Sequence, residues 1–180
     1  MRRSLLKPTA QYHHFLFLEQ TMHIHSPYIL VLSGHYDRDP GLDNYLLVLI
    51  HILNGQINEW KCTSSHAKGQ QRGDQHKKGG LIPPVHHVPD LKQWWVDLDP
   101  IYMPHNKGVR GNFYRILPFI VTTSEGGKRG DFGIHLDANA PGSLGCPVMN
   151  AYNWHDFENT IARIKAKDKV SRIPFYPLYS

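Results

Sequence analysis

Short apolar runs bounded by turn residues set the pattern of this chain. Ser26 to Ser33 (SPYILVLS) and Tyr45 to Leu53 (YLLVLIHIL) are two such runs, and runs of this length and composition are typical of buried strands. We expect Gly34 to Asn44 to be the loop between them. Asn54 and Gly55 then precede a third run, Gln56 to Thr63. Because both residues of an Asn-Gly pair tolerate positive φ, this pair predicts a tight β-hairpin.

The same pattern resumes after a polar stretch. Residues Ser64 to Gly80 carry many charges and no large apolar side chain, so burial cannot offset the entropy of ordering them, and we expect a mobile loop. Beyond it, further strands are predicted at residues 81–84 (LIPP), 94–100 (WWVDLDP), 112–123 (NFYRILPFIVTT) and 132–136 (FGIHL). Ile173 to Tyr179 predicts a closing strand, which Pro174 and Pro177 restrict to a sheet edge or to its own ends.

One segment has the pattern of a helix. Asn153 can cap it, and Phe157, Ile161 and Ile164 fall on one face at spacings of four and three. The sequence therefore predicts a mainly β fold, a single-domain sandwich or twisted sheet with one C-terminal helix packed on it. We assign residues 26–180 to this domain and residues 1–25 to an N-terminal extension.

The charge changes this picture little. A net charge of +5 suits nucleic acid, an acidic membrane or an anionic wall polymer equally. The basic residues are spread along the chain without a zinc-finger or helix-turn-helix pattern, so we expect no nucleic-acid partner. The longest apolar run is far shorter than the roughly 20 residues that span a bilayer, and the start of the chain has no signal-peptide core. We therefore expect no membrane span and no export by the general pathway.

The chemistry is concentrated in Gly130 to Asn150 (GDFGIHLDANAPGSLGCPVMN). A predicted strand delivers His135, a turn of small and polar residues reverses the chain, and Cys146 returns beside it. Because an imidazole raises the thiolate fraction of a neighbouring thiol and can return the proton to a leaving amine, such a pair suits acyl transfer. Gly145 has no Cβ to obstruct a substrate, and the NH groups of Leu144, Gly145 and Cys146 are candidate oxyanion donors.

At these residues the chain resembles the L,D-transpeptidase (YkuD-like) family, whose signature is a His, a spacer and then Ser/Thr-His-Gly-Cys. Ser143, Gly145 and Cys146 match this signature, eleven residues after His135. The short spacer and the GGLIPP segment at residues 79–84 are similar to compact phage lysins and secreted effectors of the family. The resemblance covers roughly residues 28–148 and is specific only over the last twenty.

The resemblance implies a cysteine acyl-transfer enzyme that acts on peptidoglycan stem peptides without a cofactor. Cys146 is then the nucleophile and His135 its base, while Ser143 and Gly145 belong to the same catalytic loop. Asp137 or a backbone carbonyl is expected to hold the imidazole tautomer. The sequence departs from the family at Leu144, where the supporting His is missing, and at Val148, where an Arg is frequent.

Substrate contacts are expected from several residues near this loop. Arg115, with Lys128 and Arg129, can meet substrate carboxylates, and Trp95 can line a groove. We include Asp137, Asn139 and Leu144 in the same group. Such an enzyme acts in the periplasm or cell wall, so we expect delivery by a phage particle, specialised secretion or lysis, as a monomer or as part of that assembly.

Two alternatives remain open from the sequence. The chain can be a catalytically inactive wall-binding or virion structural module that kept the β scaffold. It can also be a zinc-dependent peptidoglycan hydrolase, because thirteen histidines offer ligands, among them His51, the pair His23 and His25, and the neighbours His86 and His87. No HExxH spacing supports the zinc hypothesis, and an extended chain would turn His86 and His87 to opposite faces. Cys62 is expected to be a free, buried apolar residue.

Overall fold

The computed structural model describes residues 26–39, 42–64, 80–106, 109–138 and 143–178, and its elements confirm a mainly β fold with one C-terminal α-helix among these residues. The predicted loop at 65–79 and the extension at 1–25 lie outside them. The strands are β1 (Tyr28–Asp39), β2 (Leu42–His51), β3 (Ile57–Thr63), β4 (Trp94–Asp97), β5 (Ile101–Asn106), β6 (Val109–Leu117), β7 (Ile120–Thr122), β8 (Lys128–Gly130), β9 (Gly133–Leu136), β10 (Val148–Met149) and β11 (Arg172–Leu178). A short 3₁₀ helix, η1, covers Val85–His87, and the α-helix, α2, covers Ala151–Asp168.

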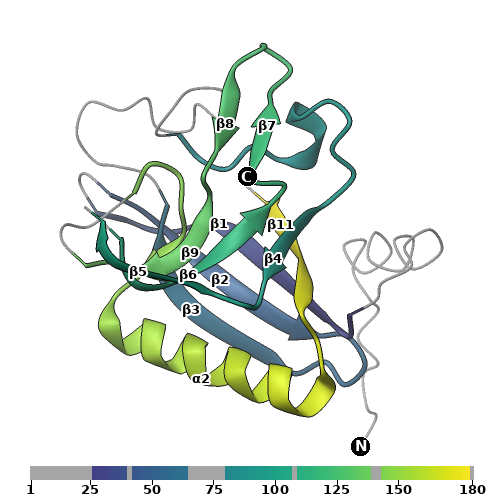
Figure 1. Ribbon diagram of the computed structural model, residues 1–180, viewed down its shortest axis with the longest axis vertical. Coiled ribbons are helices and arrows are strands. Elements are labelled where there is room, and N and C mark those ends of the chain that lie inside the picture. The colour runs from purple at the N-terminus through teal and green to yellow at the C-terminus, as the bar shows by residue number, and fades with distance from the viewer. Residues whose placement is uncertain (1–25, 40–41, 65–79, 107–108, 139–142, 179–180) are drawn as a thin grey trace, which may run out of the picture.

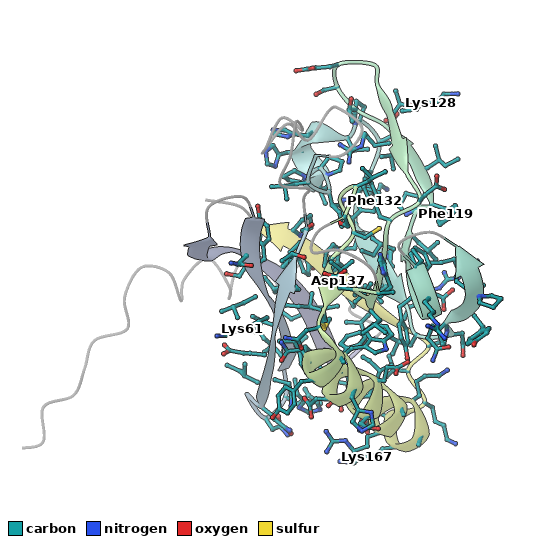
Figure 2. The ribbon with its side chains drawn as sticks, turned by 90° about the vertical axis from the view of Figure 1, so that its left-hand side faces the viewer. Lys61, Phe119, Lys128, Phe132, Asp137 and Lys167 are labelled. Atoms are coloured by element: carbon teal, nitrogen blue, oxygen red, sulfur yellow. The ribbon has the colours of Figure 1, made fainter. Side chains whose placement is uncertain are left out.

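The strands form one sheet that closes on itself. Nine strands follow the order β4-β11-β1-β2-β3-β10-β9-β6-β5, and a further pairing of the end strand β4 with β6, the last strand but one, closes a barrel-like ring that leaves β5 outside it. In Figure 1, α2 runs along one end of this sheet, and the β7–β8 ribbon projects at the other. Figure 2 accordingly shows Lys128 on β8 far from Lys167 on α2. The closed sheet thus has a helical end and a loop-rich end.

The first hairpin is longer than the hydrophobic pattern predicts. The expected loop at residues 34–44 is wrong, because β1 continues to Asp39 and pairs with β2 from Leu42 onward. Register shifts at Ser33/His35 and His35/Asp37 interrupt this part of the ladder. Backbone pairing extends both strands beyond the apolar runs that predicted them, and the bulges absorb the irregular segment.

The second hairpin is confirmed, although its turn is wider than a two-residue turn. The antiparallel ladder ends at the pair Ile50 and Ile57, and His51 N donates to Gln56 O at 2.8 Å. Gly55 takes a φ of +71°, whereas Asn54 is absent from the described non-glycine residues with positive φ. The Asn-Gly pair therefore marks the turn, but only its glycine needs the left-handed conformation.

Of the two expectations for the prolines of β11, a sheet edge or the ends of the strand, the edge position is wrong, since β11 lies between β1 and β4. It pairs with β4 over Arg172–Phe175 and runs parallel to β1 over Phe175–Leu178. Pro174 thus precedes the first β1 pair and Pro177 follows the last β4 pair. Each proline therefore lies in only one of the two ladders of β11, Pro174 in the ladder with β4 and Pro177 in the ladder with β1. This offset allows a residue without an NH inside the sheet.

Helix α2 covers one end of the core, as its apolar face predicts. Phe157, Ile161 and Ile164 are buried, and the Trp60 ring meets the Phe157 ring edge-on at 5.2 Å. The predicted cap is wrong by one turn: Asn150 is the N-cap, and its side chain accepts from Asn153 N at 3.0 Å. Asn153 instead donates from Nδ2 to Lys61 O at 3.1 Å, which ties the first turn to β3.

Two of the remaining predicted strands also differ from the structure. Leu81 to Pro84 is not a strand, although Leu81 and Ile82 are buried; the segment leads into η1. The run 112–123 divides at Pro118 into β6 and β7. Both segments contribute buried apolar side chains to the core, such as Ile82 and Ile116, and such burial does not require a strand.

Candidate active site around Cys146

Two neighbouring strands carry the predicted nucleophile and base. His135 lies on β9, and β10 runs parallel to it with Val148 opposite His135 and Met149 opposite Leu136. Pro147 O accepts a bond from His135 N at 3.3 Å. Cys146 precedes Val148 by two positions, so the chain brings its backbone alongside the start of β9.

The Cys146 thiol is bound to the backbone near the start of β9. Its Sγ donates to Asp131 O at 3.6 Å, and the Gly133 backbone also bonds to it. Burial raises the pKa of Cys146 to about 11; the Asp131 charge raises it further, whereas the Gly133 hydrogen bond and the Arg129 charge oppose the rise. Among the described residues, no hydrogen bond joins this sulfur to His135. The resting thiol is therefore protonated at neutral pH.

The His135 imidazole is buried and held by its own neighbour. Its Nδ1 lies 2.8 Å from Leu136 O, and its ring stacks on Phe113 with centroids 5.6 Å apart. Since a carbonyl only accepts, Nδ1 carries the hydrogen and Nε2 keeps a free lone pair. Burial lowers the pKa of His135, against the opposing effect of the Leu136 bond. The ring is thus a neutral base, and a backbone carbonyl rather than Asp137 holds its tautomer.

Ser143 fixes the loop before the cysteine. Its Oγ donates to Cys146 O and accepts from Gly145 N at 3.2 Å. The Gly145 NH is therefore occupied within the loop in this structure, although the sequence placed it among the candidate oxyanion donors. These contacts of Ser143 orient the loop, and they do not involve His135.

Gly145 is required by packing of the chain itself. Its φ is +115°, and a Cβ built there would lie 2.6 Å from Gly80 O and 3.0 Å from the Phe132 ring. Ser64 Oγ donates to Gly145 O at 2.9 Å. The space that the sequence assigned to a substrate is thus filled by residues of the chain, and glycine is needed there because no other residue fits.

Arg129 is a component of the site whose role the sequence did not reveal. Its side chain is buried, Nη2 donates to Gly80 O at 2.8 Å, and its guanidinium lies 5.1 Å from the centre of the Phe132 ring. The sequence suggested contact with a substrate carboxylate, but this cation lies inside the protein and acts on Cys146 through its charge. The exposed neighbour Lys128 has the surface position that was expected of both.

The other predicted contact residues are spread more widely. Arg115 lies opposite Gly133 on β6 and forms an ion pair with Asp97 at 2.8 Å. Leu144 is exposed beside Cys146, and Asp137 follows β9 with its NH bonded to Met149 O at 2.8 Å. Trp95 is half-buried on β4, whose partners are β6 and β11 and not β9 or β10. Asn139 lies outside the described residues.

The second cysteine and the histidine pair also have defined places. Cys62 is free and buried on β3, as predicted, and burial raises the pKa of its thiol. His86 and His87 lie in η1, not in an extended segment, and their ring centroids are 4.2 Å apart. Within the described ranges, no three His, Cys, Asp or Glu side chains gather as a metal site would require. His23 and His25 lie outside these ranges.

Comparisons with known proteins give this chain no relative. No protein-family model matches it, and no curated protein or solved structure matches it significantly. In the part of the chain that the structure describes, no helix has the length and apolar character to cross a membrane. The function is therefore inferred from the residues of the site.

Proposed function

We propose that the chain is a cysteine acyl-transfer enzyme acting on peptidoglycan stem peptides, with Cys146 as nucleophile. The observation that carries this proposal is the parallel pairing of β9 and β10, which puts a free thiol two positions from the register partner of a buried, neutral histidine. The sequence resemblance to L,D-transpeptidases supplies the substrate class. A neutral imidazole with a free Nε2 is the form that a general base needs.

In the proposed reaction, the Cys146 side chain turns from Asp131 O toward His135, and the thiol proton passes to Nε2. The sulfur then attacks an amide carbonyl of the stem peptide. The C–N bond breaks, the proton goes from His135 to the leaving amine, and a thioester remains on Cys146. An amine or water displaces the sulfur and restores the thiol. Catalytic hydrogen bonds are often absent before substrate binds, which is consistent with the resting position of the sulfur.

Purified sacculi provide the test. Wild-type protein and Cys146→Ala are incubated with sacculi, and the muropeptides are analysed by mass. Cys62→Ala is the matched control, since it removes the other thiol on β3 and keeps Cys146. We expect wild type and Cys62→Ala to change the muropeptide masses and Cys146→Ala to leave them unchanged. A gain of water indicates hydrolysis, and a new cross-link indicates transpeptidation.

A second candidate, a catalytically inactive wall-binding or structural module, is favoured by two observations on the thiol. Its pKa is raised, and its hydrogen bond goes to a backbone carbonyl and not to the imidazole. Binding of wild-type protein to sacculi without any change of muropeptide mass would support this candidate over catalysis. Activity that survives Cys146→Ala and is lost with a chelator would instead support the zinc hydrolase.

A further inference from the structure

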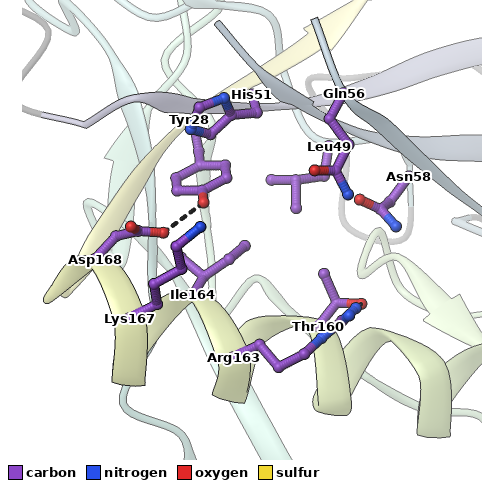
Figure 3. Close-up of a pocket in the computed structure, with 10 residues that line it drawn as sticks. All are labelled: Tyr28, Leu49, His51, Gln56, Asn58, Thr160, Arg163, Ile164, Lys167 and Asp168. Atoms are coloured by element: carbon purple, nitrogen blue, oxygen red, sulfur yellow. Dashed lines mark hydrogen bonds between the residues drawn. The ribbon is translucent and has the colours of Figure 1, made fainter. Parts of the chain in front are cut away.

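A polar hollow of about 150 Å³ lies between the second half of α2 and strands β1 to β3 (Figure 3). This volume corresponds to roughly five water molecules. Leu49 and Ile164 contribute buried apolar surface to it, and polar side chains from both sides surround them. Asn58 is five residues along β3 from Thr63, which pairs with Val148, so the hollow is about 17 Å along the strand from the Cys146 end.

Polar side chains lie on both sides of this hollow, and some of them, Gln56 and Lys167 included, are exposed to solvent. The side-chain amides of Gln56 and Asn58 approach from the strand side, and Lys167 rises from the helix toward Tyr28 (Figure 3). Among the described residues, these three side chains make no hydrogen bond or ion pair. Arg163 donates to Thr160 Oγ1 at 2.9 Å, which uses one of its five N–H donors. The hollow therefore offers a ligand several N–H donors, beside the acceptor oxygens of the two amides.

The charge of the residues that line the hollow favours a negatively charged ligand. Arg163 and Lys167 are cations, and Asp168 is the one carboxylate among the residues that line the hollow. Tyr28 Oη donates to Asp168 Oδ2 at 2.6 Å, so this carboxylate already has a partner in the wall of the site. Two cations against one bound carboxylate leave a net positive charge, and charge-assisted bonds from Arg, Lys and amides are the usual ligands of an oxyanion.

We propose that this hollow binds a small molecule with an oxyanion group, a carboxylate or a phosphate, joined to a short apolar part. The oxyanion meets Lys167, Arg163 and the two amides, and the apolar part rests on Leu49 and Ile164. This site is separate from the Cys146 loop and does not depend on the function proposed there.

Nuclear magnetic resonance titration of the full chain tests the proposal. Sodium butyrate and sodium phosphate are the two probes, and sodium chloride at equal ionic strength is the reference. We expect one of the probes to shift the side-chain amide signals of Gln56 and Asn58 to saturation, and chloride not to. Saturation by butyrate identifies a carboxylate ligand, and saturation by phosphate identifies a phosphate ligand.

Variants on α2 show whether the cations of the hollow cause the binding. Arg163→Gln combined with Lys167→Gln is expected to weaken probe binding at least tenfold. Lys165→Gln is the matched control, because Lys165 is on the same helix but pairs with Asp99, and it should bind within twofold of wild type. Equal shifts with chloride, no saturation by either probe, or equal losses in Lys165→Gln and the double variant would overturn the proposal.

Discussion

Burial moves the two reactive groups in opposite directions. It raises the pKa of the Cys146 thiol and lowers the pKa of the His135 imidazole, so both groups are uncharged at neutral pH. Formation of a thiolate and an imidazolium would place two charges in a buried site, which burial disfavours. Only Arg129 and the Gly133 backbone favour the thiolate. The proton transfer of the proposed reaction would thus depend on substrate binding or on a change in the position of the sulfur.

The alkylation rate of Cys146 should report this raised pKa. Because the thiolate is the reactive form, its rate with iodoacetamide should rise about tenfold per pH unit from pH 7 and level off near pH 11. Mass analysis of Cys62→Ala protein follows Cys146 alone. Arg129→Gln should slow the reaction by removing the opposing charge, whereas the exposed Lys128→Gln should not. A plateau already below pH 8 would contradict the raised pKa and indicate a thiolate stabilised by His135.

Gly145→Ala should destabilise the protein strongly. The added Cβ would meet Gly80 O at 2.6 Å in a backbone conformation with φ of +115°, so we expect a loss of about 3 kcal/mol in the free energy of unfolding. Gly126→Ala is the control, since its φ is +80° but nothing lies within 4 Å, and about 1 kcal/mol should be lost. Guanidinium denaturation measures both. Equal losses would mean that the contact with Gly80 does not matter.

The sequence predicted the local part of this site better than the distant part. A strand ending near His135 and a return at Cys146 follow from turn residues within one short segment. The burial of Arg129, the contact of Gly145 with Gly80 and the ion pair of Arg115 with Asp97 involve residues far apart in the sequence. Hydrophobic periodicity carries no information on such pairs, which depend on the order of strands in the sheet.

At the level of elements, backbone pairing explains most differences from the predicted strands. Residues 34–39 were expected in a loop because they lie between two apolar runs, but β1 and β2 continue there through their backbone ladder. The prolines of β11 were expected to restrict it to an edge or to keep to its ends, yet its two ladders are offset so that Pro174 and Pro177 each face one paired neighbour inside the sheet. In both segments the side chains predicted fewer strand pairings than the backbone hydrogen bonds form.

The cap of α2 provides a test at this scale. Asn150→Ala removes the side-chain acceptor of the Asn153 NH, and we expect the free energy of unfolding to fall by about 1 kcal/mol. Asn159→Ala, at an exposed position in the same helix, should leave stability equal or slightly higher because alanine favours helix. Chemical denaturation followed by circular dichroism measures both. A larger loss in Asn159→Ala would contradict the assigned cap.

For the whole molecule, buried acidic groups limit stability at high pH. Burial raises the pKa of Cys146 from 9.0 to about 11 and those of Tyr28 and Tyr114 from 10.0 to about 12. It also raises the pKa of Cys62. Between these values the unfolded chain has lost protons that the folded chain still holds, so the unfolded state binds fewer protons and stability must fall as pH rises.

Denaturation at several pH values checks this dependence. The free energy of unfolding should change little from pH 7 to 8.5 as far as these groups are concerned, and then decline by at most about 1.4 kcal/mol per pH unit for each group. Cys62→Ala removes one group, so its decline between pH 9 and 11 should be shallower than that of wild type. Stability that increases over this interval would contradict the assigned burial.

The place of β11 has a consequence for how the protein is made. A ribosome produces β1 and β4 long before residues 172–178, which lie between them in the finished sheet. Until that segment emerges, the outer edges of both strands have no partner, and open edges of this kind attract other chains. The ring therefore stays open until residues 172–178 have emerged, and we expect the nascent polypeptide to need protection from aggregation until then.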